Sequence, residues 1–126
     1  MKAGKPYNGG QWTEARYKAF IKAGLRALTN RWGPKNACVK RAWIERGVYK
    51  CAGYKRRWHK VPVSIKVGKK RMRNIAVDHI EPVVNPTTGF VSWDDFIKRL
   101  FVEIDDLQLL CKSCHDAKTS DERKLR

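Results

Sequence analysis

Two short segments of this chain concentrate the residue types that bind metal ions. In residues 75–80, three apolar residues are followed by Asp78 and His79. In residues 107–115, a mostly apolar segment is followed by Cys111-x2-Cys114 and His115. A Cys-x2-Cys pair has the spacing of zinc thiolates, and structural zinc takes four protein ligands. The fold must therefore bring two further ligands to this pair, which constrains the chain more than any other pattern.

Cys51 is the clear third ligand of this predicted zinc site, because it precedes a predicted hairpin that can bring it beside Cys111 and Cys114. The fourth is open between His59, in the turn after Cys51, and Cys38, in a predicted helix where a thiol can pack as a small apolar group. We favour His59. In a reducing compartment these cysteines are expected as metal ligands and not as disulfides.

Periodicity predicts an α+β fold of basic helices and short strands. A polar, Gly-rich start, residues 1–12, is expected to be disordered. The predicted helices run from a Thr13 cap to Trp32, from Pro34 to Gly47, after a Ser92 cap, and from about Lys112 to the end. The predicted strands are residues 48–51, 61–67, 72–80 and 107–111, with residues 68–71 as a four-residue turn. The apolar stripe of the first helix is expected in a core.

Charge is distributed unevenly along the 126 residues. The net charge is +16, and residues 1–75 carry 21 basic and 2 acidic side chains, whereas residues 76–126 carry 7 and 10. This segregation is typical of a protein that grips a phosphate backbone with one region and holds cations in another. A generic basic protein, such as a ribosomal component, would also be basic.

Residues 76–126, the more acidic part of the chain, contain the groups that phosphodiester hydrolysis requires. His79, at the end of a predicted strand, suits the general base that activates water, and Asp78 suits a ligand of Mg²⁺ or Mn²⁺. His115 supplies a nitrogen ligand, which widens the choice to Ni²⁺, Co²⁺ or Zn²⁺. Neighbouring strand residues face opposite sides, so we expect Asp78 to bind the ion and His79 to hold the water. Lys118 could steady the scissile strand, but we favour its interpretation as a solvated helix lysine.

These motifs resemble the HNH (His-Asn-His) endonucleases of the ββα-metal, or His-Me finger, superfamily. The resemblance rests on Asp78-His79, on LQLLCKSCH and on Lys118-Thr119. More narrowly, the basic helices followed by CAGY, VDHIEPVV and FVSWDDFIKRLF resemble small HNH endonucleases encoded by tailed bacteriophages. It implies a zinc-braced ββα core that enters the minor groove and hydrolyses duplex DNA to 3′-hydroxyl and 5′-phosphate ends. His79 is the implied base, and Asp78 and His115 are the implied ligands of the catalytic ion.

The chain departs from the family pattern at two positions. The middle asparagine falls on Asp106, which lacks an amide donor. The second cysteine of the first knuckle falls on Tyr54. We therefore expect Asp106 to belong to the site in an undefined role, and His59 or Cys38 to complete the zinc set.

The expected organisation is one compact domain, with residues 1–47 as a DNA-gripping extension and residues 48–126 as the nuclease core. No run approaches about 18 apolar residues, and the start lacks a secretory apolar segment, so a cytoplasmic protein is expected, in the host if phage-encoded. Duplex DNA is the expected partner, with packaging or other phage proteins as further candidates. The alternatives are a non-catalytic zinc module that binds nucleic acid and a ribosomal-type RNA-binding protein.

Overall fold

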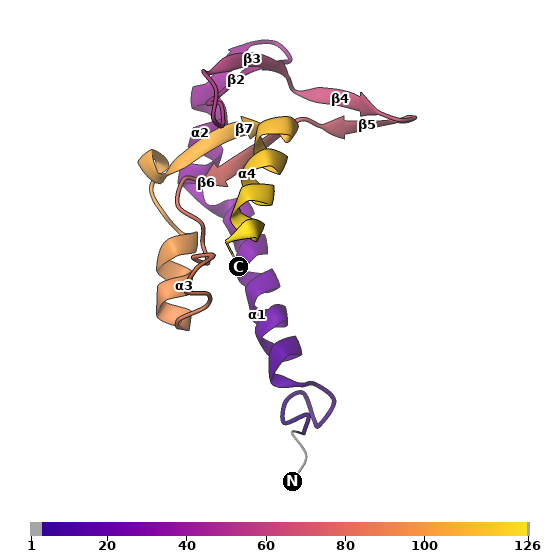
Figure 1. The fold of residues 1–126 in the computed structure, drawn as a ribbon, viewed down its shortest axis with the longest axis vertical. Helices are drawn as coiled ribbons and strands as arrows, with labels where there is room; N and C mark the ends of the chain where they lie inside the picture. The colour runs from indigo at the N-terminus through magenta and orange to yellow at the C-terminus, as the bar shows by residue number, and fades with distance from the viewer. Residues whose placement is uncertain (1–3, 126) are drawn as a thin grey trace. The chain divides into compact units, whose positions relative to one another are not determined.

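The computed structural model describes residues 4–125 and has an α+β architecture with small antiparallel sheets (Figure 1). The chain divides into two compact units, residues 1–31 and 32–126, which are described separately. Within residues 4–125, no helix combines the length and the apolar character needed to cross a membrane.

The first unit contains a turn closed by a bridge between Tyr7 and Trp12, helix α1 (Glu14–Leu28) and the 3-10 helix η1 (Thr29–Arg31). The predicted Thr13 cap is confirmed, because its hydroxyl accepts a hydrogen bond from the Arg16 amide at 3.2 Å. The predicted disorder of residues 1–12 is wrong for residues 4–12, and residues 1–3 lie outside the described residues. Tyr7 pairs with Trp12 as a bridge and stacks on Tyr17 with ring centroids 4.0 Å apart. No residue of α1 is buried, so its apolar stripe forms no core within this unit.

The second unit begins with helix α2 and contains all the strands. Its elements are α2 (Gly33–Ala42), β1 (Trp43–Glu45), β2 (Val48–Cys51), β3 (His59–Pro62), β4 (Ser64–Val67), β5 (Lys70–Arg73), β6 (Ile75–His79), α3 (Trp93–Leu100), the 3-10 helix η2 (Ile104–Asp106), β7 (Leu107–Cys111) and α4 (Lys112–Lys124). The strands form three antiparallel sheets, β1-β2-β3, β4-β5 and β6-β7. The predicted strands β2 and β7, the Ser92 cap and the start of α4 are confirmed.

Several predicted boundaries are wrong. The helix expected up to Gly47 ends at Ala42, because Gly47 adopts φ +76° and reverses the chain, so that residues 43–45 pair with β2. The runs 61–67 and 72–80 each split in two, because their halves pair with different partners. The turn between them is Gly68-Lys69 alone, with Gly68 at φ +63°. In each case the pairing partner decides the boundary, and the local pattern does not.

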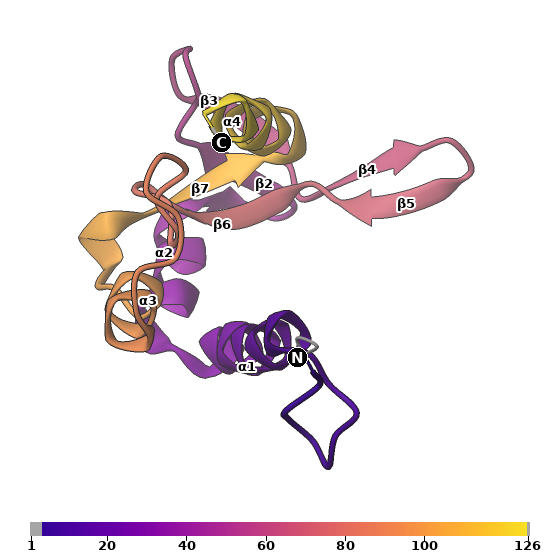
Figure 2. The same cartoon turned by 60° about the horizontal axis from the view of Figure 1, so that its bottom comes forward.

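The β6–β7 pair lies at the centre of the second unit. Helices α4 and α2 pack on its two opposite faces (Figure 2). Leu109 and Leu110 of β7 are buried with Cys38 and Ala42 of α2 in one core cluster. Helix α2 therefore belongs to the unit that holds the core, and the division between the two units falls after Arg31. Alternation along β6 places Asp78 and His79 on opposite faces.

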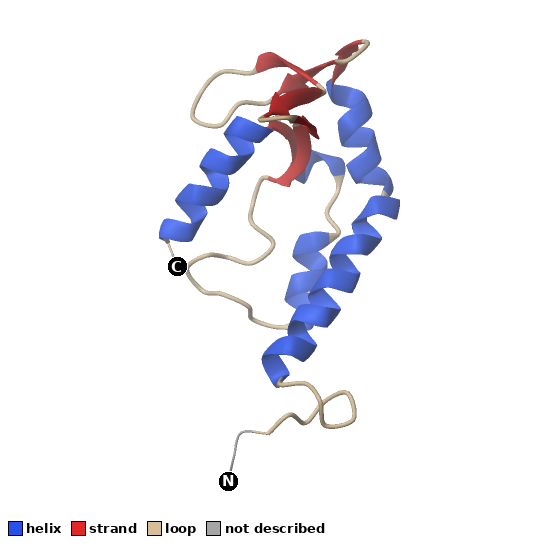
Figure 3. Cartoon of the chain, turned by 90° about the vertical axis from the view of Figure 1, so that its right-hand side faces the viewer, coloured by secondary structure: helices blue, strands red, loops and turns tan. Residues whose placement is uncertain are grey.

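A long loop, residues 80–92, joins β6 to α3 (Figure 3). Asn85 orders its middle: its side-chain oxygen accepts hydrogen bonds from the Thr87 amide at 2.9 Å and the Thr87 hydroxyl at 2.7 Å. Arg99 of α3 donates to the Pro82 carbonyl at 3.1 Å. The loop leaving Asp78-His79 is thus held to α3, whose last turn comes back to His79.

Candidate functional site

Four side chains converge at one end of the β6–β7 pair. They are Cys51, His59, Cys111 and Cys114, and their ligand atoms all lie within 4.8 Å of one another. Ligand atoms of a tetrahedral Cys₃His zinc site lie about 3.3 to 3.8 Å apart, so a small contraction accommodates the ion. The structure thus brings together three thiols and one imidazole in a cluster that can hold zinc. Cys38 lies outside this cluster.

The donor set is oriented by neighbouring polar groups. The amides of Gly53 and Cys111 donate to Cys51 Sγ at 3.4 and 3.2 Å. His59 Nδ1 lies 3.2 Å from the Arg57 carbonyl oxygen, which can only accept, so Nδ1 carries the proton. His59 Nε2 then presents its lone pair to the cluster, 3.7 Å from Cys111 Sγ. This is the tautomer that a zinc ligand requires.

The thiols differ in how readily they ionise. Burial raises the pKa of Cys51 to about 11. Burial also opposes ionisation of Cys111, but hydrogen bonds to its sulfur, the one from the Cys114 amide first, outweigh it and lower its pKa to about 7. Cys111 is therefore the readiest thiolate, and zinc must displace the proton of Cys51.

The loop between β2 and β3 carries Cys51 at its start and His59 at its end. Gly53 adopts φ +85°, and a Cβ there would lie 2.4 Å from the Arg56 carbonyl oxygen, so this position requires glycine. Tyr54 occupies the position where the family resemblance expects a cysteine. Its hydroxyl donates to Asp121 of α4 at 2.7 Å, and Lys55 pairs with the same oxygen at 2.9 Å. These two partners, Lys55 first, lower the pKa of Asp121 to about 2.

Asp78 is buried on the α4 side of β6 and is bonded through one oxygen only. Gln108 Nε2 donates to its Oδ2 at 2.9 Å, and Lys118 Nζ donates to the same atom. Oδ1 has no partner within residues 4–125, and no buried side-chain oxygen or nitrogen there lacks one. Oδ1 is therefore not completely buried.

Lys118 is buried, which makes its interpretation as a solvated lysine wrong. Besides Asp78, its ammonium donates to the carbonyls of His79 at 2.6 Å and Ile80 at 3.0 Å. One feature of the sequence indicated this burial. Lys118 lies four residues after Cys114, so the two share one side of α4, and that side must face inward if Cys114 binds zinc. Lys118 fixes the backbone where β6 passes into the loop.

His79 Nε2 lies 2.8 Å from the Leu100 carbonyl oxygen. Leu100 ends α3, where carbonyls lack helical partners, and a carbonyl only accepts. In the neutral ring Nε2 therefore carries the proton and Nδ1 keeps its lone pair. An imidazole in this state can accept a proton from water.

The remaining predicted residues are less closely held. His115 is partly exposed on α4, and Asp106 is exposed at the end of η2. The Asp106 carbonyl accepts the Ile80 amide at 3.0 Å and so extends the β6–β7 pairing by one bond. Within residues 4–125, only the Cys₃His cluster gathers three or more His, Cys, Asp or Glu ligands. Asp78, His115 and Asp106 form no second such group.

Asn74 supports the site and was not predicted. It precedes β6, and its carbonyl and side-chain oxygens lie 3.0 and 3.3 Å from the Lys112 amide, the first of α4. Cys111 occupies the N-cap of α4 without a side-chain cap bond, so Asn74 satisfies the amide instead. Its amide group donates to the Pro62 carbonyl at 2.9 Å. A polar residue inside an apolar alternation was the one signal in the sequence.

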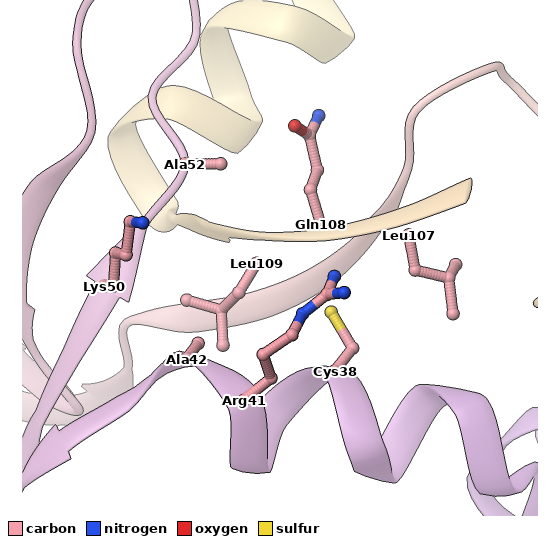
Figure 4. Close-up of a pocket in the computed structure, with 8 residues that line it drawn as sticks. All are labelled: Cys38, Arg41, Ala42, Lys50, Ala52, Leu107, Gln108 and Leu109. Carbon is pink, nitrogen blue, oxygen red and sulfur yellow. The ribbon is translucent and has the colours of Figure 1, made fainter. Parts of the chain in front are cut away.

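A hollow of about 270 Å³ lies between α2 and β7 (Figure 4). It is lined by Cys38, Arg41, Ala42, Lys50, Ala52, Leu107, Gln108 and Leu109. Burial raises the pKa of Cys38, although Arg41 acts in the opposite direction. None of the lining residues is a carboxylate or a histidine.

The comparisons with known proteins do not assign the chain. No family model matches it, and neither a curated protein nor a solved structure is similar enough to count as a match.

Proposed function

We propose that this protein is a metal-dependent DNA endonuclease of the HNH type, with β6, β7 and α4 as its ββα-metal core. The observation that carries the proposal is the state of His79: the Leu100 carbonyl holds the proton on Nε2 and leaves Nδ1 free. This histidine follows Asp78, whose Oδ1 is open to a cation. A base and a hard oxygen ligand thus occupy adjacent positions at the end of one strand.

The hydrolytic step uses His79 as the proton acceptor. Nδ1 accepts a proton from water as the water oxygen attacks phosphorus, and the bond from phosphorus to the 3′ oxygen breaks. The departing oxygen then takes up a proton, which leaves 3′-hydroxyl and 5′-phosphate ends. The Leu100 carbonyl holds the ring in place and stabilises the imidazolium that forms.

Asp78 Oδ1 and the ring of His115 are the groups proposed to hold the catalytic ion. His115 lies three residues before Lys118, about 60° around α4, so it belongs to the part of α4 that turns toward Asp78. Mg²⁺ or Mn²⁺ keeps several waters and needs few protein ligands, which suits this sparse set. When bound, the ion neutralises the charge that develops on the phosphate.

Plasmid nicking by His79→Ala tests the assignment. With Mg²⁺ or Mn²⁺ we expect the rate to fall about 10²- to 10⁴-fold, the usual contribution of a general base. Zinc content and DNA retardation should stay as in the wild type. His59→Cys is the matched control, since a Cys₄ set should keep both zinc and nicking. Unchanged nicking by His79→Ala would remove His79 from the catalytic role.

A second candidate is a zinc module that binds nucleic acid without cutting it. The ion pair between Lys118 and Asp78 favours this reading, because an ammonium already neutralises the carboxylate. It predicts DNA binding with no divalent-dependent cleavage at any tested metal. An RNA-binding protein would in addition prefer RNA over duplex DNA.

A further inference from the structure

Strands β4 and β5 form a two-stranded arm that projects from the second unit (Figure 2). The basic arm, residues 64–73, contains Lys66, Lys69, Lys70, Arg71 and Arg73 and no acidic residue. All five cations are exposed, and none forms an ion pair with any residue between 4 and 125. Five like charges on one short ribbon repel each other, and an anionic partner removes that repulsion.

The register of the arm sorts its side chains onto two faces. Ser64 pairs with Arg73 and Lys66 with Arg71, so one face carries three cations and a hydroxyl. The other carries Ile65, Val67 and Met72, with Lys70 near the tip. Val67 and Met72 remain 44% and 43% exposed. The cationic face of the arm can thus lie along a row of phosphates, while the other face is largely apolar.

The base of the arm is fixed to the core. The Asn74 amide donates to the Val63 carbonyl at 2.8 Å, and the Val63 amide donates to the Gly47 carbonyl at 2.9 Å. The Asn74 side chain donates to Pro62, and its carbonyl accepts from the first amide of α4. Binding therefore does not have to order a loose segment at the root of the arm.

We propose that the basic arm enters the major groove of duplex DNA and supplies phosphate contacts beside the cleavage site. The major groove, about 12 Å wide, admits a two-stranded ribbon, whereas the minor groove is only about 6 Å wide. Six residues separate Arg73 from His79, which spans at most about 20 Å. Half a turn of B-DNA is about 17 Å, which is roughly the distance from one groove to the next along the helix axis. With the β6–β7–α4 core in a minor groove at His79, the arm therefore reaches the adjacent major groove. The position relative to the cut rests on the proposed function, but the binding does not.

The salt dependence of binding tests the arm. The probe is a labelled 30-base-pair duplex, titrated with zinc-loaded protein without added Mg²⁺. For Lys66→Gln/Lys69→Gln/Arg71→Gln we expect the slope of log K against log salt to shrink by about 2.7 units, at about 0.9 per lost phosphate contact. The charge-matched control is Arg46→Gln/Lys98→Gln/Arg123→Gln, three exposed cations outside the arm, which should shift the slope by less than one unit. Equal shifts for the two triple variants would overturn the proposal.

Three further readouts separate the alternatives. Lys66→Arg/Lys69→Arg/Arg71→Lys keeps the charges and should restore the wild-type slope; failure to do so would contradict the phosphate role. A duplex with bulky groups at pyrimidine C5 fills the major groove, and unchanged wild-type affinity for it would exclude that groove. A change in oligomeric mass without a change in DNA affinity would assign the arm to a second copy of the chain. A wild type that binds DNA through the arm but never nicks it would refute only the proposed function.

Discussion

The two ends of the β6–β7 pair differ in how completely the chain supplies their ligands. At the Ile75–Cys111 end, three thiols and an imidazole converge within 4.8 Å. At the His79–Leu107 end, Asp78 is neutralised by Lys118, and His115 and Asp106 stay apart. A closed set of four ligands is typical of a structural zinc site, and an open set leaves room for substrate and water. The Cys₃His end of the β6–β7 pair can hold a structural zinc ion, and the proposed function places the hydrolytic reaction at the other end.

Removing a zinc ligand should have the largest effect. Cys111→Ser should reduce the zinc content from one ion per chain to near zero and abolish cooperative unfolding. The apparent contribution of structural zinc in small domains is about 10 to 16 kcal/mol, which matches or exceeds the stability of a small domain. Metal analysis and circular dichroism provide the measurement.

Cys38→Ala is the matched control for this change, because Cys38 is equally buried but lies outside the cluster. We expect full zinc content and a loss of about 1 to 2 kcal/mol, as for an ordinary small core truncation. Loss of zinc from this variant would show that the closed end is not the set described here.

The buried ion pair at the open end should rank second. Lys118→Met leaves the Asp78 carboxylate buried without its cation, which costs about 3 to 5 kcal/mol in such pairs. Urea unfolding of the zinc-loaded protein measures the loss. Adding Asp78→Asn removes the charge as well and should recover part of it. If the single variant were as stable as the wild type, Lys118 would not be the element that holds the open end together.

The smallest effect is expected at Asp106. Its carbonyl bonds to Ile80 and its side chain is exposed, so Asp106→Asn should change stability by less than about 0.5 kcal/mol. Nicking by this variant should stay within about tenfold of the wild type, because no observed contact depends on the carboxylate. A larger change would place the side chain against the substrate.

The sequence predicted the closed end better than the open one, for physical reasons. Cys111 and Cys114 lie within one turn of α4, and Cys51 and His59 flank a single loop, so local spacing predicted the zinc set. Lys118 and Asp78 are 40 residues apart, and whether that lysine is buried depends on how α4 packs. The chain reversal at Gly47 and the division of the predicted strands at Val63 and Asn74 also depend on which strands pair. The alternation of apolar and polar residues does not reveal that pairing.

Basic and acidic residues are also concentrated in different parts of the chain. Of the basic residues, five lie within the ten residues of one hairpin, where the register decides which of them share a face. The acidic residues gather around β6, η2 and α4 instead. The two proposals therefore place phosphate binding and catalytic-ion binding in separate parts of the second unit.

Binding of Mn²⁺, followed by electron paramagnetic resonance in the presence of duplex DNA, tests the central claim most directly. The zinc-loaded wild type should bind one exchangeable Mn²⁺ in addition to its tightly held zinc. Asp78→Asn/His115→Ala should lose the Mn²⁺ and keep the zinc. Identical Mn²⁺ binding by this variant and the wild type, or loss of zinc together with Mn²⁺, would contradict the assignment of two metals to the two ends of the β6–β7 pair.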